Sequence, residues 1–159
     1  MKRLFPVLLS TLLGLVLSEP ALAYDESELR TFNALNRCVN CNLSGADLSG
    51  INISGAVLSG ADLTGASFRL TQLSAADLTG ANLSNADFSG ADIEGVNFTE
   101  AKLVKAILDD AQNLRGAKLN RANLSWVYLN GVDLSGIDLI GTNLSGADLN
   151  GANLRRANL

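Results

Sequence analysis

The fold of this chain is decided by a five-residue unit, plainest in Leu43-Ser-Gly-Ala-Asp-Leu48-Ser-Gly and repeated in Leu144-Ser-Gly-Ala-Asp-Leu149-Asn-Gly. A bulky apolar residue stands at every fifth position from Leu43 to Leu108, and after one extra residue the spacing resumes at Leu114. Around the central residues the other positions also repeat: a small or β-branched residue stands two before, and usually Asp or Asn one before, Ser or Thr one after, and Gly two after. Internal repeats of this kind indicate a solenoid.

The five-residue period matches neither the helix period of 3.6 residues nor the strand period of 2. In an extended backbone, however, the central residue and the small residue two before it point the same way. The Ser/Thr-Gly pair that follows favours a turn, because Gly adopts positive φ without a steric penalty. Each unit therefore predicts a short extended segment and a corner. Four units would close a square coil of about twenty residues, and the chain would form about six stacked coils.

Residues 42–159 resemble the pentapeptide-repeat family, whose motif is written A(D/N)LXX. The resemblance implies an all-β solenoid, specifically a right-handed quadrilateral β-helix. Because Phe68 and Phe88 are twenty residues apart, we expect their side chains to stack in successive coils. The acidic residues that precede the central residues should fall on different walls and form no single stripe. They are Asp47, Asp62, Asp77, Asp87 and Asp92.

Residues 1–23 read as a secretory signal peptide: Lys2 and Arg3 precede an apolar run, and Ala21-Leu22-Ala23 matches a cleavage site. An uncleaved anchor or a buried helix is the alternative interpretation. No second apolar stretch follows, so the mature chain is expected to have no membrane segment. Its compartment would be the periplasm or a thylakoid lumen.

Residues 24–41 are predicted to cap the solenoid. Asp25 and Glu28 have the spacing of a capping box at the start of a helix over residues 25–37. Leu29, Phe32 and Leu35 would form its apolar face. An atypical terminal element of this kind is needed because the end of a solenoid exposes unpaired backbone and core.

Cys38 and Cys41 form a C-x-x-C pair just before the first repeat, where both are expected to point toward the axis. Three interpretations fit the pair. It is a structural disulfide in an exported protein, two inward-facing free thiols, or a redox-active motif. No βαβ pattern surrounds the pair, which disfavours the redox interpretation. Exported members of the family often carry this pair ahead of the first repeats.

One extra residue between Leu108 and Leu114 predicts a bulge or small loop near residues 109–113. Asp109 and Asp110 are candidates there for a paired-carboxylate metal site, although adjacent acids are more often solvated; we predict no metal. If the bulge keeps the corners in phase, Tyr128 lies one coil beyond Ile107 and Trp126 one coil beyond Lys105.

Those four residues all occupy outward-facing positions and define what we call the aromatic patch: Lys105, Ile107, Trp126 and Tyr128. Exposed aromatic side chains are typical of contact hot spots, although isolated surface hydrophobes are also ordinary. A cation–π contact with a neighbouring lysine would fit this arrangement. Basic residues gather in the same region of the sequence: Lys102, Lys105, Arg115, Lys118 and Arg121.

Several function classes are disfavoured by composition. The chain contains no His, which removes the commonest general base and zinc ligand, and no nucleotide-binding or nucleophile motif is present. The formal net charge of −4 argues against a nucleic-acid partner. We therefore expect no catalytic residues and no cofactor.

The favoured function is a structural or protein–protein interaction module in an exported compartment, with an unknown protein partner. The alternatives are a DNA-mimicking topoisomerase inhibitor, an activity known in the family, and a redox protein acting through Cys38 and Cys41. Leu159 is itself a central residue, so the last coil is expected to be uncapped and to pair end to end with a second copy.

Overall fold

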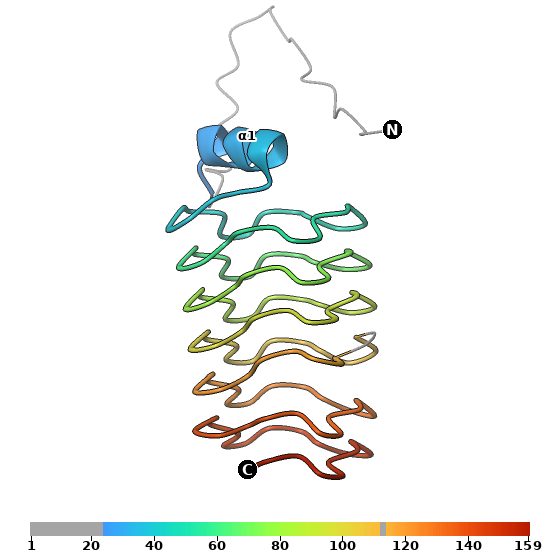
Figure 1. Cartoon of the computed structure of the whole chain (residues 1–159). Coiled ribbons are helices and arrows are strands. Elements are labelled where there is room, and N and C mark those ends of the chain that lie inside the picture. The colour runs from blue at the N-terminus through green and yellow to red at the C-terminus, as the bar shows by residue number, and fades with distance from the viewer. Residues whose placement is uncertain (1–23, 112–113) are drawn as a thin grey trace, which may run out of the picture.

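The computed structural model describes residues 24–111 and 114–159 as a rod of stacked coils with one helix, α1, across its N-terminal end (Figure 1). The predicted signal peptide, residues 1–23, lies outside the described residues. Isolated parallel β-bridges join each coil to the next, and no extended strand forms among the described residues. Each side of a coil is therefore one bridged residue between two turns, as the five-residue unit predicts.

The bridges fall into four columns, which we call walls 1 to 4. Wall 1 contains Asn42, Asp62, Asn82, Lys102, Asn123 and Asn143. Wall 2 contains Asp47, Ser67, Asp87, Ile107, Tyr128 and Asp148. Wall 3 contains Asn52, Gln72, Asp92, Asp133 and Asn153, and wall 4 contains Arg37, Val57, Asp77, Asn97, Lys118, Asp138 and Asn158. Walls 1 and 2 show that the bridge spacing is twenty residues before the insertion and twenty-one across it, so the insertion keeps the corners in phase.

Asp or Asn usually precedes the central residue because its side chain closes the corner. Asp47 Oδ1 accepts a hydrogen bond from the Ser49 N–H at 3.0 Å, and Asn52 does the same for Ser54 at 3.0 Å. The Ala46 N–H then donates to the Leu43 carbonyl at 3.0 Å, with Gly45 at φ +71°. This is the positive φ that favours glycine at the third position of a turn. The repeat is thus a sequence of side-chain-capped turns.

The axis of the rod is filled by the central residues and the small residues two before them. Phe68 and Phe88 stack with ring centroids 4.8 Å apart, which confirms the expectation from their spacing. Phe98 adds an edge-on contact with Phe88 at 5.8 Å that the spacing did not predict. One small-residue position differs from expectation: Ile51 is 36% exposed, because it lies in the first coil on wall 3, where no earlier coil covers it.

Helix α1 spans Glu26–Leu35, and Phe32 is its fully buried side chain. Leu29 is partly buried, but Leu35 is 68% exposed, so the prediction that Leu35 faces the core is wrong. Leu29 and Leu35 lie about 60° around the helix axis on either side of Phe32, and with Phe32 at the centre of the buried stripe the helix leaves Leu35, its last residue, in solvent.

The predicted capping box forms only in part. Asp25 Oδ1 accepts from the Ser27 N–H at 2.7 Å and the Glu28 N–H at 3.3 Å, as an N-cap does. Glu28 does not reach back to Asp25; its Oε2 instead accepts the Asn42 N–H at 2.5 Å. The Asp25 N–H donates to the Asn42 carbonyl at 3.1 Å. These bonds fasten the helix to the first coil.

Candidate functional site

The aromatic patch lies where wall 1 turns into wall 2. Trp126 occupies the corner, at φ +59°, and Tyr128 is the next bridged residue on wall 2. Ile107 pairs directly with Tyr128, and the Lys105 N–H donates to the Ser125 carbonyl at 3.0 Å. Ile107 and Lys105 of the earlier coil therefore lie beside Tyr128 and Trp126, as the sequence predicts. Trp126 is 61% exposed and Tyr128 is 47% exposed, so both present aromatic surface to solvent.

The Trp126 ring packs toward the following coil, not toward Lys105. An added Cβ at Gly146 would lie only 2.7 Å from Cε3 and 2.8 Å from Cδ2 of the indole. The described residues form no cation–π contact, so the expected one with a lysine is absent; the indole instead rests over Gly146. Gly146 was missed as part of the site, although a glycine twenty residues after a long corner residue is the signal that could have found it.

The same arrangement recurs at other corners. Leu70 lies over Gly90, where an added Cβ would be 2.8 Å from the leucine Cδ2, and Arg121 lies over Gly141 at 3.3 Å. Leu70 is 69% exposed and has φ +56°, which makes it a close match to Trp126 in backbone conformation and surroundings. A corner side chain and the glycine of the next coil thus form one packing unit.

The acidic residues near the aromatic patch are held by partners of their own. Asp87 pairs with Arg69 at 2.9 Å on wall 2, and Asp109 accepts the Asn130 N–H at 2.9 Å. Partial burial acts to raise the pKa of Asp87, but hydrogen bonds from Ser89 and the Arg69 guanidinium outweigh it and leave that pKa lowered. Asp148, one coil beyond Tyr128, accepts the Asn150 side-chain amide at 2.6 Å.

Asp47 and Asp87 both lie on wall 2, so the prediction that the five acids fall on different walls is wrong for this pair. A shift of forty residues is two full coils and returns the chain to the same wall. Hydrogen bonds from the Ser49 side chain and backbone lower the pKa of Asp47. Between the two acids lies Ser67, and beyond Asp87 come Ile107 and Tyr128, so the wall carries no continuous acidic stripe.

The basic residues that gather in the sequence are separated by the fold. Lys102 lies on wall 1 and Lys105 at the corner beside it, next to the aromatic patch. Lys118 lies on wall 4. Arg115, whose carbonyl accepts from Gly95, belongs to the far side of the rod. Only part of the basic sequence cluster is therefore available to the aromatic patch.

Cys38 and Cys41 are both buried, at 7% and 5% exposure, and the structure joins them in a disulfide with Cα atoms 5.6 Å apart. The Cys38 N–H donates to the Val57 carbonyl, and the Cys41 carbonyl accepts from Asp62. The pair thus lies inside the junction between α1 and the first coils. Low exposure limits access of another thiol to either sulfur.

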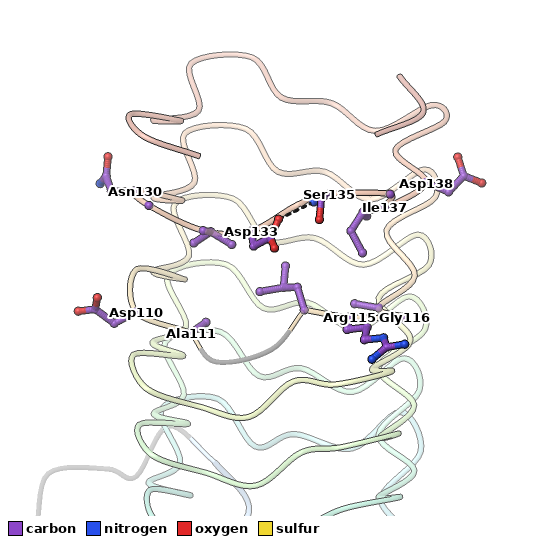
Figure 2. Close-up of a pocket in the computed structure, with 14 residues that line it drawn as sticks. Asp110, Ala111, Arg115, Gly116, Asn130, Asp133, Ser135, Ile137 and Asp138 are labelled. Carbon is purple, nitrogen blue, oxygen red and sulfur yellow. Dashed lines mark hydrogen bonds between the residues drawn. The ribbon is translucent and has the colours of Figure 1, made fainter. Parts of the chain in front are cut away.

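The insertion region borders a surface hollow of about 720 Å³ along wall 3 (Figure 2). Figure 2 shows Asp110 and Asp138 at opposite ends of the hollow and directed outward, while Asp133 accepts a hydrogen bond from the Ser135 N–H at 2.9 Å. Among residues 24–111 and 114–159, no group of three or more His, Cys, Asp or Glu side chains could hold a metal ion. Gln112 and Asn113 lie outside the described residues.

A sequence profile described as Pentapeptide repeats matches residues 41–80, 71–110, 113–146 and 122–159. The chain is similar to the crystal structure of HetL, a pentapeptide-repeat protein involved in heterocyst differentiation regulation from the cyanobacterium Nostoc sp. strain PCC 7120. The identity is 30% over 76% of this chain and 60% of HetL, with a TM-score of 0.52.

A second pentapeptide-repeat protein from Nostoc PCC 7120 is 28% identical over 86% of this chain and all of that one, with a TM-score of 0.51. QnrB1, a plasmid-mediated fluoroquinolone resistance protein, is 23% identical over 76% of this chain, with a TM-score of 0.63. That likeness shows the fold alone. This chain spans 60% of the length of HetL and 61% of the length of QnrB1. No curated protein matches the chain.

Proposed function

Because this chain belongs to the pentapeptide-repeat family, we propose that it is a non-enzymatic interaction module whose working surface is the aromatic patch. The observation that carries the proposal is the proximity of two exposed aromatic side chains, Trp126 at 61% on the corner and Tyr128 at 47% two residues later on wall 2. Aromatic residues of this kind dominate the free energy of protein–protein contacts. The filled axis of the rod leaves no enclosed pocket for a substrate there.

In a pull-down from an extract of the periplasm or thylakoid lumen, the double variant Trp126→Ala/Tyr128→Ala is expected to lose the partner that the wild-type protein captures. The amount of partner recovered is compared between the two proteins. Removing two hot-spot aromatics should weaken binding by more than about 2 kcal/mol, or roughly thirtyfold in affinity. Leu70→Ala is the matched control, because Leu70 is an exposed corner residue with the same backbone conformation on another corner. Equal recovery of partners by the double variant and the control would contradict the proposal.

The protein acts in an exported compartment, a periplasm or a thylakoid lumen, with Cys38 and Cys41 oxidised to a structural staple. Support comes from the signal-like residues 1–23 and from the buried disulfide, since such bonds persist in oxidising compartments. α1 is the single helix of the described residues, and none of them forms a helix that is long and apolar enough to cross a membrane.

Expression with its own N-terminus in a Gram-negative host tests the compartment. We expect periplasmic protein that begins at Tyr24 and has no titratable thiol without reductant. Cytosolic protein that retains residues 1–23, or a preparation with two free thiols, would contradict this assignment. The mass of the released chain and a thiol titration provide the two measurements.

In the proposed assembly, two copies pair end to end, so that each covers the last coil of the other. Leu159 is 79% exposed, and Leu144, Leu149 and Leu154 are less buried than the central residues of the earlier coils. Their backbone N–H groups have no acceptor among the described residues, so the edge offers donors to a second copy. In a size measurement at micromolar concentration, the purified periplasmic protein should have the mass of two copies. A monomer would contradict the proposed dimer.

Neither alternative function is favoured by an observation at the site. A DNA mimic needs a continuous acidic face, whereas wall 2 passes from Asp87 to Ile107 and Tyr128. A redox protein needs an accessible sulfur, whereas both cysteines are buried.

A further inference from the structure

We propose that the aromatic patch binds an acidic protein segment, whose carboxylates pair with Lys102 and Lys105 while its apolar side chains cover Trp126 and Tyr128. This proposal rests on the proposed function and names the chemistry of the partner. The binding surface consists of wall 1 near Lys102 and the corner that joins it to wall 2.

The charge of this surface is unbalanced. Neither Lys102 nor Lys105 lies within 4.0 Å of a carboxylate in the part of the chain that the structure describes. Arg121, at the corner where wall 4 turns into wall 1, differs because it already pairs with Glu100 at 3.4 Å. Two adjacent lysines on an acidic protein, with formal net charge −4, are therefore left to attract an external carboxylate.

The neighbours on wall 1 do not neutralise these lysines. Along the wall, Lys102 bridges Asn82 on one side and Asn123 on the other, both uncharged. The nearest acidic residue in that column is Asp62, two coils away, and it accepts hydrogen bonds from Thr64. On wall 2, Asp87 is paired with Arg69, whereas Asp148, which bridges Tyr128, bonds to the neutral Asn150 and keeps its charge on the Tyr128 side of the patch, away from the wall that carries Lys102.

The apolar part of the surface is held in place before binding. The indole of Trp126 rests against Gly146, so the ring has little rotamer freedom to lose when a partner covers it. Tyr128 lies beside it on a stiff, bridged wall. A segment in extended conformation places alternate side chains on one face, so a sequence in which every second residue is in turn acidic and apolar presents both kinds of side chain to the lysine and aromatic groups.

Titration of the full chain with a short peptide of the repeated unit Glu-Ser-Leu-Ser, which places Glu and Leu in turn on one face and is called the Glu–Leu peptide below, tests the proposal. Trp126 is the single tryptophan of the chain, so its fluorescence reports binding at the patch. We expect the affinity to fall as salt is raised, and Lys102→Glu and Lys105→Glu each to weaken binding by about tenfold. Lys118→Glu is the matched control; it makes the same charge change on wall 4 and should alter affinity by less than about twofold.

Three outcomes would overturn the proposal: no fluorescence change with the Glu–Leu peptide, equal effects of the Lys102 and Lys118 reversals, or tighter binding of a Lys–Leu peptide or a single-stranded DNA. The test is separate from that of the proposed function. If the Trp126→Ala/Tyr128→Ala variant loses its captured partner while the lysine reversals leave peptide affinity unchanged, the result supports the proposed interaction surface and contradicts the proposal of an acidic partner. If capture is unaffected by the aromatic variant, the proposed function itself falls.

Discussion

Phe88→Ala is expected to lower the free energy of unfolding by about 3–5 kcal/mol. The Phe88 side chain is fully buried, stacks on Phe68 at 4.8 Å and meets Phe98 edge-on at 5.8 Å. Truncation leaves a cavity at the centre of a rod whose walls are fixed by bridges on both sides, so little collapse can fill it. Loss of the two ring contacts adds about 0.5–1.5 kcal/mol for each pair.

Urea unfolding followed by circular dichroism measures this effect. Phe88→Leu is the matched control, because it keeps most of the buried apolar volume and should be markedly less destabilising. Leu70→Ala, at a 69% exposed position, should change stability little. If Phe88→Ala and Leu70→Ala had similar effects, the axis of the rod would not be the packed core described above. Because solenoids can unfold coil by coil, the urea transitions are followed with a second probe, tryptophan fluorescence, beside circular dichroism.

Gly146→Ala is expected to destabilise the protein more than Gly131→Ala does. Both glycines have positive φ, +70° and +69°, so an alanine at either position meets backbone strain of about 1–2 kcal/mol. An added Cβ at Gly131 has nothing within 4 Å, whereas at Gly146 it collides with the Trp126 ring at 2.7 Å. The difference between the two variants, about 1–3 kcal/mol, isolates the contact between the indole and the glycine.

The double variant Trp126→Ala/Gly146→Ala completes the cycle and should recover the excess destabilisation of Gly146→Ala. In the single variant the indole should move toward solvent, which a red shift of the tryptophan emission would report. A Gly146→Ala protein with unchanged emission and the stability of Gly131→Ala would contradict the packing described here. Gly146 lies behind the ring and does not form part of the exposed patch surface. Displacement of the indole by Gly146→Ala should nevertheless weaken binding at the aromatic patch.

Several features of the fold were predictable because they are local and repeated. The five-residue spacing predicts the corners, since Asp or Asn before a central residue and Gly after it act within one turn. It also predicts the twenty-residue return that stacks Phe68 on Phe88 and, with one inserted residue, pairs Ile107 with Tyr128. These statements need only the period and the number of sides.

Other features depend on side-chain direction and on the ends of the rod, where the period gives no information. The indole of Trp126 packs forward onto Gly146, Glu28 bonds to Asn42, and Leu35 lies in solvent. The separation of Lys102 from Lys118 onto different walls likewise follows only when residues are placed around four sides. The sequence by itself therefore determined the repeat, its corners and its core, because each unit carries its own turn. The tertiary structure alone decided which exposed groups meet, because that depends on contacts between coils about twenty residues apart.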